Sequence, residues 1–371
     1  MLYNLDEICL IPSELTDVNS RSECEVYKDN KLPLYISPMT SLIDAGNIDN
    51  FELLGFNSIL PRTLALDYRM EMLAQGYTVA FGLKEAEHIY NRLNVLKINN
   101  QLNYVPHICI DQANGHMSSL LNICKKFKDS LGINGVWLVV GNIANPDTYF
   151  KYAEVGVDAI RVGIGSGNVC TTSIQTGIHY PMGSLIINCY KAKQEVVKKI
   201  DEEYQLYNLI SDSIQESFKY KSAPLIIADG GFKNIDQIIK ALALGADCVM
   251  LGEIVAHSKE ACGEVSWQLL DGIHCDARLY YGMSTEKAQT YINETSSFQN
   301  NIKHSEGICK WVPVEYSISE WKESFIHGLK SAMSYTNAIK LEDFIGKVKY
   351  DTMSQNTINQ YTQNKKVYKW Q

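Results

Sequence analysis

A cysteine that stands between glycines and threonines is the residue of this sequence best placed to act as a nucleophile. Cys170 follows a glycine-rich stretch, residues 163–168, and precedes Thr171 and Thr172 directly. The thiolate is the reactive form of a cysteine, and backbone N–H groups that point at the sulfur favour it. A loop of small residues exposes such groups, so we interpret Cys170 as a candidate for covalent catalysis.

Three glycine-bearing loops could hold an anion near this cysteine. They cover residues 163–172, residues 229–231 with their sequel at 252–253, and residues 280–284. Glycines at the ends of strands let the backbone approach a ligand closely and direct its N–H groups at a phosphate. An ordinary tight turn would explain any one of these loops, but three of them together with Cys170 indicate a binding site.

The elements that must position these loops form a repeat. Apolar runs at 136–140 and 225–228 predict buried strands, each followed by a turn, a helix and a second strand at 159–162 or 248–251. Gly156 and Gly245 precede the second strands, Gly163 and Gly252 follow them, and both pairs are 89 residues apart. Short apolar strands that alternate with helices predict a parallel sheet covered by helices. A single closed (βα)8 TIM barrel over residues 1–350 fits this pattern better than an open sheet, and it places the glycine loops at the active-site end.

Two segments depart from the repeat. Residues 184–220 carry apolar residues at three- and four-residue steps among Lys and Glu, which predicts one or two amphipathic helices inserted into the barrel. We expect this insertion to pack on the barrel exterior or on a neighbouring subunit. Residues 351–371 are rich in Asn, Gln, Thr and Lys and are expected to form a loosely ordered tail.

Composition excludes several classes of protein. Hydrophobic residues make up 46% of the 371 residues and charged residues 20%, as in an ordinary globular protein. The net charge of −8 argues against nucleic-acid binding through the overall field, so a phosphate must be held locally. We expect no membrane span, because no run of about 18 apolar residues occurs. No signal peptide is visible, and the ten cysteines form no Cys-x-x-Cys pair, which favours reduced thiols in the cytoplasm.

Several motifs resemble the IMP dehydrogenase / GMP reductase family. The matching stretches are residues 162–165 with 170–172 and 176–177, then 227–231, 245–252 and 281–284, with weaker matches at 37–39 and 110–115. The resemblance covers residues 1–350 apart from the 184–220 segment. It implies a (βα)8 barrel, which agrees with the repeat, and a homotetramer that binds a purine mononucleotide.

The resemblance also implies roles for individual residues. Cys170 would attack C2 of the purine and form a thioimidate, and Thr172 with Glu306 would handle the proton of the leaving amine. Asp229 would bind the ribose, and the nucleotide pocket would be completed by Ser37, Met39, Asn168, Gly230, Gly231, Gly252, Glu253, Tyr280, Gly282, Met283, Ser284 and Gly307. NADPH would be the cofactor, held by Ser20, Arg21, Arg62, Asp111, Gln112, Ala113, Ile164, Gly165, Lys303, Lys330 and Ser331. Main-chain oxygens of Gly165, Gly167 and Cys170 would bind a monovalent cation such as K⁺.

The segment before Glu306 separates the two activities of this family. IMP dehydrogenases use a long flap with an Arg-Tyr pair, whereas only 23 residues, none of them Arg, lie here between Gly282 and Glu306. Residues 305–307 read Ser-Glu-Gly, as in GMP reductases. We therefore predict NADPH-dependent reductive deamination of a guanine mononucleotide. The alternatives are an IMP dehydrogenase without regulatory modules and a nucleotide-binding homologue without turnover.

This chain also departs from the family pattern around the nucleotide and the cation. Asn168 stands where a phosphate-binding serine is usual, Ser173 replaces a basic residue, and Thr40 replaces an aspartate. An Asn amide can still donate a hydrogen bond to a phosphate. The departures leave the catalytic cysteine in place and make a deoxynucleotide or a modified guanine nucleotide an open alternative.

Overall fold

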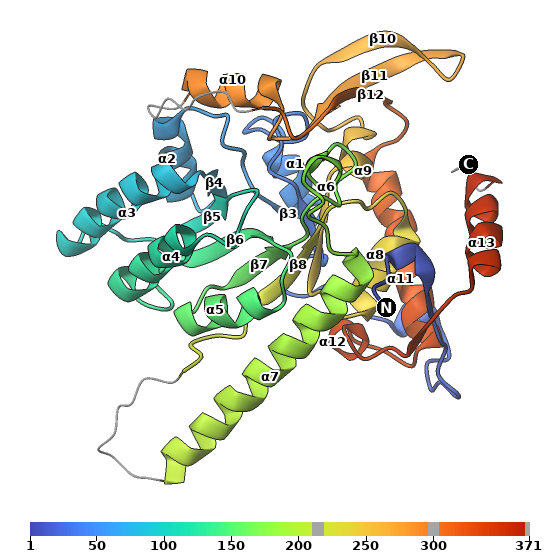
Figure 1. Ribbon diagram of the computed structural model, residues 1–371, viewed down its shortest axis with the longest axis horizontal. Coiled ribbons are helices and arrows are strands. Elements are labelled where there is room, and N and C mark those ends of the chain that lie inside the picture. Colours follow the sequence, from blue (N-terminus) through green and yellow to red (C-terminus); the bar gives the residue numbers. More distant parts are fainter. Residues whose placement is uncertain (210–218, 296–303, 368–371) are drawn as a thin grey trace.

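The computed structural model describes residues 1–209, 219–295 and 304–367, and its centre is a sheet of eight parallel strands (Figure 1). A parallel bridge between Leu60, just after one edge strand, and Val79 of the other edge strand closes this sheet on itself. The predicted α/β barrel is thereby confirmed. In sheet order the strands are β3 (Asn57–Ser58), β2 (Leu34–Ile36), β9 (Cys248–Leu251), β8 (Leu225–Asp229), β7 (Ala159–Val162), β6 (Trp137–Ile143), β5 (His107–Asp111) and β4 (Val79–Phe81).

The interior of the barrel is a small core of its own. Each strand, or the residue just beyond it, contributes one inward side chain, and these eight side chains form one buried cluster: Tyr35, Ile59, Ala80, Cys109, Val139, Ala159, Ile227 and Met250. Side chains alternate between the two faces of a strand, so the residue two positions further also points inward. That next layer, at the C-terminal ends of the strands, contains Asp111, Arg161 and Asp229.

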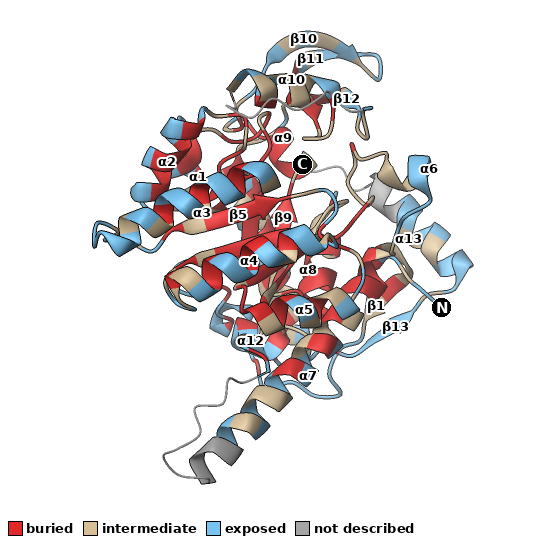
Figure 2. Ribbon diagram, turned by 60° about the vertical axis from the view of Figure 1, so that its left-hand side comes forward, coloured by how far each residue is buried: buried red, intermediate tan, exposed pale blue. Residues whose placement is uncertain are grey.

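Helices cover the outside of the barrel and bury a second, larger core against the strands (Figure 2). Their outer faces are exposed, while the strands between them are almost entirely buried. The helices of this layer are α2 (Leu66–Ala74), α3 (Leu83–Ile98), α4 (Ser118–Leu131), α5 (Asp147–Val155), α7 (Met182–Leu209), α8 (Ile235–Ala243), α9 (Glu253–Ala256) and α11 (Ile318–Tyr335). Shorter elements at the rims are η1 (Leu5–Glu7), η2 (Arg21–Glu23), α1 (Ile48–Leu53), α6 (Thr172–Thr176), α10 (Glu286–Thr295) and α12 (Leu341–Phe344).

The repeat has a physical cause in two equivalent aspartates. Asp158 accepts a hydrogen bond from the backbone N–H of Leu138 at 2.6 Å and forms an ion pair with Lys128 at 2.6 Å. Asp247, 89 residues later, accepts from the N–H of Ile226 at 2.7 Å and pairs with Lys193 at 2.6 Å. Each carboxylate ties one strand to the next and to a lysine of a covering helix.

Two segments differ from the expectation drawn from the sequence. Residues 184–209 belong to α7, a single helix that packs against α5 and β8 as the barrel helix between β7 and β8, and its far end projects beyond the barrel (Figure 1). This half of the segment is therefore a lengthened barrel helix and not an insertion, while residues 210–218 lie outside the described residues. The tail is ordered in part: β13 (Tyr350–Thr352) pairs with β1 (Ile8–Leu10), and α13 (Gln355–Val367) follows.

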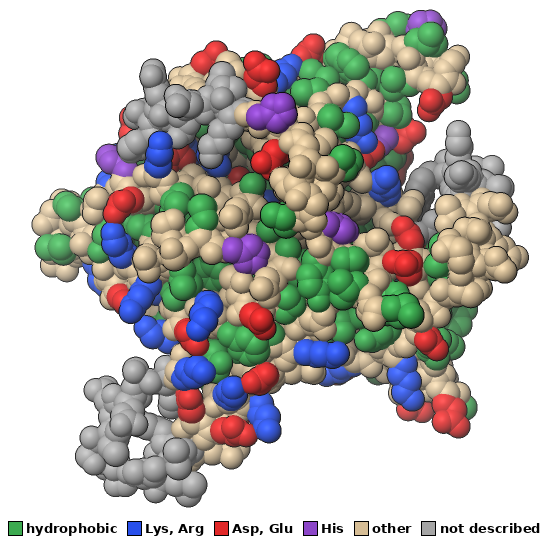
Figure 3. Space-filling view, viewed as in Figure 1, with side chains coloured by type: hydrophobic (Ala, Val, Ile, Leu, Met, Phe, Trp, Pro, Cys, Tyr) green, Lys and Arg blue, Asp and Glu red, His purple; other side chains and the backbone are tan. Residues whose placement is uncertain are grey.

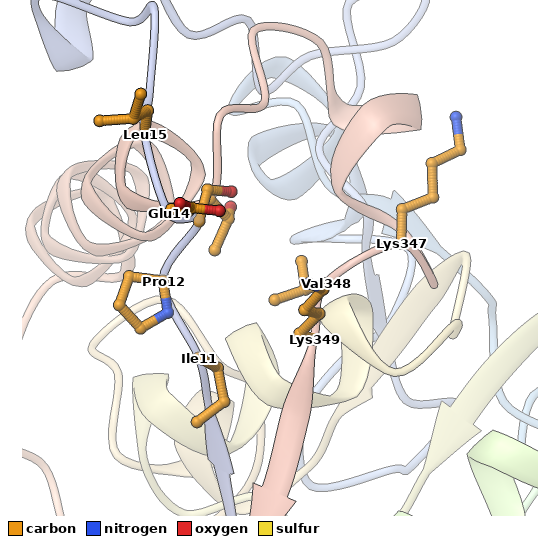
Figure 4. A pocket seen from close by; sticks show the side chains of 9 residues that line it. Ile11, Pro12, Glu14, Leu15, Lys347, Val348 and Lys349 are labelled. Carbon is orange, nitrogen blue, oxygen red and sulfur yellow. The ribbon is translucent and has the colours of Figure 1, made fainter.

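A three-stranded antiparallel sheet stands beside the barrel. It consists of β10 (Val265–Leu270), β11 (Ile273–Tyr281) and β12 (Cys309–Pro313), and two of the predicted binding segments lie at its ends. A hollow near β1 and β13 (Figure 4) is lined by residues such as Pro12 and Val348 and shares no residue with the predicted site.

The described surface carries charges of both signs. Lys and Arg side chains are interspersed with Asp and Glu on the face seen in Figure 3. None of the helices in the described ranges is long and apolar enough to cross a membrane.

Candidate functional site

The predicted catalytic residues meet where the loop after β7 contacts the segment before β12. Cys170 forms an antiparallel bridge with Gly307, and the backbone N–H of Ile308 donates to the carbonyl of Val169 at 3.0 Å. The N–H of Thr171 donates to the main-chain carbonyl of Glu306 at 2.9 Å. These main-chain contacts bring a residue 136 positions distant in sequence against the cysteine loop.

Three side chains form a directed chain of hydrogen bonds across this contact. The thiol of Cys170 donates to Thr172 Oγ1 at 3.2 Å, and the Thr172 hydroxyl donates to Glu306 Oε2 at 2.8 Å. Thr172 starts the short helix α6, which fixes the threonine two residues after the cysteine. The arrangement offers a path by which a proton can move between the sulfur and the carboxylate through one hydroxyl.

The second glycine loop packs directly against the first. Gly230 and Gly231 adopt φ angles of +120° and +83°, and a Cβ atom on either would lie 2.5 Å from an atom of Ser166. A Cβ on Gly163 would lie 2.1 Å from the carbonyl oxygen of Asp229. Only glycine fits such contacts, so these residues are required for the close approach of the loops. Asn168 lies half-buried in the same loop.

The third group of predicted pocket residues comes from β2, β9 and β11. Tyr280 is buried and donates its hydroxyl hydrogen to the sulfur of Met39 at 3.8 Å, and a Cβ on Gly252 would lie 2.6 Å from that hydroxyl oxygen. The sulfur of Met283 accepts a hydrogen bond from Thr40 at 3.8 Å. The remaining residues adjoin them: Ser37 is buried after β2, Gly282 faces Val169, Ser284 lies beside Gly307, and Glu253 begins α9.

Arg161 connects the predicted nucleotide and cofactor residues, and sequence reasoning missed it. Its guanidinium, buried inside the barrel, pairs with Asp111 at 2.5 Å and with Asp229 at 2.7 Å. Asn142 adds a hydrogen bond of 2.7 Å to the same oxygen of Asp229. Burial alone would lower the pKa of Arg161, but the charges of Asp229 and Asp111 raise it instead. The sequence did contain a signal for this network, namely an arginine inside the apolar run 159–162. A charge on a buried strand must be paired, so it predicts carboxylates nearby.

The cofactor residues fall into two groups, of which the first adjoins Arg161. Arg62 donates to the main-chain carbonyl of Asp111 at 3.0 Å, and its Nε atom is buried without a partner within the described residues. The backbone of Gln112 hydrogen-bonds to β6, Ala113 is exposed beside it, and Ile164 is buried next to Gly165. The Arg62 guanidinium packs against Gly82 and lies 4.0 Å from the carboxylate of Asp111, beside the exposed Ala113.

The second group is not brought to the cysteine loop. Ser20 and Arg21 lie at η2, which packs against α11, the helix that carries Lys330 and Ser331. Within the described part of the chain, no hydrogen bond or ion pair joins these four residues to the loop of Cys170. Lys303 lies outside the described residues.

The predicted cation site has two of its three carbonyl groups already engaged. The hydroxyl of Ser173 donates to the carbonyl of Gly165 at 3.1 Å, and the N–H of Cys170 donates to the carbonyl of Gly167 at 3.0 Å. A carbonyl oxygen has a second lone pair, so K⁺ still fits through the remaining ones. The described ranges contain no cluster of His, Cys, Asp or Glu that could hold a metal ion.

Comparison with known proteins identifies the class to which this barrel and its cysteine loop belong. Residues 74–202 and 207–362 match the IMP dehydrogenase / GMP reductase domain. The chain is therefore a member of the IMP dehydrogenase / GMP reductase family, which confirms the resemblance drawn from its motifs.

Named relatives carry both activities of the family. The chain is 26% identical over 370 residues to a GMP reductase of Bacillus licheniformis, covering 96% of this chain and 98% of that protein. It is 26% identical to a GMP reductase of Onchocerca volvulus, over 76% of this chain and 67% of that protein. An inosine-5′-monophosphate dehydrogenase of Helicobacter pylori is 30% identical over 63% of this chain, which spans only 43% of that relative's length. These relatives are a dehydrogenase and two reductases, all oxidoreductases by name.

Proposed function

We propose that this protein is an NADPH-dependent, GMP reductase-like enzyme that reductively deaminates a guanine mononucleotide. The observation that carries the proposal is the hydrogen-bond chain from Cys170 through Thr172 to Glu306. The near full-length match to a GMP reductase, in contrast to the partial match to the dehydrogenase, supports the same assignment. A cytoplasmic homotetramer is proposed with it.

The residues would act in two steps. In the first, the thiol proton of Cys170 passes through Thr172 to Glu306, and the thiolate forms a bond to C2 of the guanine. Glu306 returns the proton to the exocyclic amine, the C2–N bond breaks, and ammonia leaves a thioimidate on the sulfur. Asp229, held by Arg161, would fix the ribose so that C2 faces the sulfur.

In the second step, the carbon–sulfur bond breaks and Cys170 is regenerated as C2 is reduced. NADPH, when bound, supplies the hydride for this reduction. Arg62, Asp111 and Gln112 would hold it. Overall, GMP, NADPH and two protons give IMP, NADP⁺ and ammonium, so atoms and charge balance.

A purified-protein screen tests the proposal. Purine mononucleotides, including deoxyguanosine monophosphate, are incubated with NADPH or with NAD⁺, in the presence and absence of K⁺, and absorbance at the nicotinamide band and ammonia release are followed. We expect NADPH oxidation with equimolar ammonia from a guanine nucleotide. Steady NAD⁺ reduction with IMP and no ammonia from any guanine nucleotide would overturn the assignment in favour of an IMP dehydrogenase.

A further inference from the structure

A lysine that the sequence analysis did not select lies against the wall of the proposed nucleotide pocket. Lys310 on β12 pairs with Tyr280 in the strand register, and its ammonium lies 5.9 Å from the centre of the Tyr280 ring. The same ammonium donates to Glu253 Oε1 at 2.7 Å. Lys310 thus bridges two residues of the proposed pocket, one beside Gly252 and one on β11.

The carboxylate of Glu253 creates an electrostatic problem for a phosphate at this place. Burial raises the pKa of Glu253, but the hydrogen bond from Lys310 and the nearby imidazole of His257 outweigh that effect and lower the pKa to about 2. Glu253 is therefore ionised at neutral pH, where a phosphate monoester carries about −1.5 to −2 charges. Backbone N–H groups alone would leave a phosphate next to this carboxylate without a full compensating charge.

Among the described residues around Glu253, Lys310 is the cation that can turn toward a ligand. His257 lies 3.0 Å from Glu315 and 4.0 Å from Glu253, and its ring stacks on Tyr316, so its position is fixed from several sides. Asp229, the other nearby carboxylate, is held by Arg161. The side chain of Lys310 is 31% exposed and sits on a flexible four-carbon stem. If its ammonium turns away, His257 remains 4.0 Å from Glu253 and shares its charge between Glu253 and Glu315.

We propose that Lys310 binds the 5′-phosphate of the nucleotide, and that Glu253 holds its ammonium at the pocket wall until the nucleotide enters. The inference rests on the proposed function for the position of the nucleotide, and it adds a phosphate-binding residue to that site. A lysine acts on phosphate as a flexible point charge, so it can exchange one anionic partner for another without a change in the backbone.

Two ligands that differ only by the phosphate separate this role from a structural one. Binding of GMP and of guanosine is measured by calorimetry without a nicotinamide cofactor, on the wild type and on Lys310→Gln. We expect the variant to bind GMP about 10- to 100-fold more weakly, as for loss of one charged phosphate contact, and guanosine within about threefold of wild type. Lys310→Arg should restore most of the GMP affinity.

Lys287 provides a matched control. It forms an ion pair of 3.1 Å with Glu264 and lies 5.4 Å from the ring of Tyr281, the neighbour of Tyr280, with the same side-chain exposure as Lys310. Lys287→Gln should leave the affinity for both ligands unchanged. Glu253→Gln should strengthen GMP binding several-fold, because it removes the competing anion, and should leave guanosine binding unchanged.

Each outcome decides the proposal. The Lys310–Glu253 pair is only structural if folded Lys310→Gln loses affinity equally for GMP and guanosine. The same conclusion follows if the wild type binds guanosine more tightly than GMP. A GMP-specific loss without NADPH-linked ammonia release would support Lys310 and overturn the proposed reaction. Failure of both ligands to bind the wild type would overturn both proposals.

Discussion

Replacing Glu306 by glutamine is the sharpest test of the hydrogen-bond chain at the cysteine. The amide keeps the size of the side chain, and its oxygen can still accept the hydrogen of Thr172, now 2.8 Å away. It cannot take or return a proton at neutral pH, so both proton transfers that involve Glu306 are lost. General acid–base catalysis contributes typically about 10²–10⁴ in rate. We therefore expect kcat to fall by this factor, equivalent to about 3–5 kcal/mol of activation free energy.

The structure also says what this substitution should leave intact. The segment around Glu306 contacts the cysteine loop through main-chain bonds, namely the Cys170–Gly307 bridge and the bond from Thr171 to the carbonyl of Glu306. Nucleotide affinity should therefore stay within about threefold of wild type. The assay is NADPH oxidation with ammonia release at saturating guanine nucleotide, with GMP binding measured separately. A kcat within threefold of wild type would refute the proton-transfer role of Glu306, and Glu264→Gln serves as a surface control.

Three further predictions concern the nucleophile, the buried charge network and pH. Cys170→Ala should abolish turnover and leave nucleotide binding largely intact, and turnover within tenfold of wild type in a rapid-mixing assay would end the thioimidate hypothesis. Arg161→Met should lower the free energy of unfolding by about 3–5 kcal/mol, because it removes the guanidinium that pairs with Asp111 and Asp229 in the barrel. Urea denaturation measures the free energy of unfolding, and a loss below about 1 kcal/mol would contradict this prediction. Burial would lower the pKa of His257, but its two glutamate partners raise it from 6.5 to about 9. The stabilisation of the folded state by protonated His257 is therefore complete below pH 6.5 and lost as pH rises through 9. It amounts to at most about 3 kcal/mol of unfolding free energy. Between pH 7 and 10 the Tm of the wild type should therefore fall by more than the Tm of His257→Asn.

The barrel could be predicted because its repeat consists of local sequence features. Apolar runs of strand length, glycines at their ends and an aspartate before each second strand recur at one spacing, and the two aspartates make the same bonds to a strand and a lysine. The amphipathic pattern of residues 184–209 was likewise sufficient to predict a helix. It was not sufficient to show that this helix is the barrel's own, because a lengthened barrel helix and an inserted one have the same periodicity.

Sequence alone also selected Cys170, since a thiol in a loop of glycines and hydroxyls is typical of a nucleophile. The roles of Thr172 and Glu306 came from the family resemblance, and the distances that make them a chain of hydrogen bonds depend on how two distant loops pack. Arg161 and Lys310 show the limit most clearly. Arg161 stands out as a charge in an apolar strand and Lys310 does not, but the role of each depends on which carboxylates other strands and helices bring within 3 Å. Charge pairing acts through space and falls off within a few ångströms, so only the closed barrel decides which residues of a linear chain share one electrostatic site.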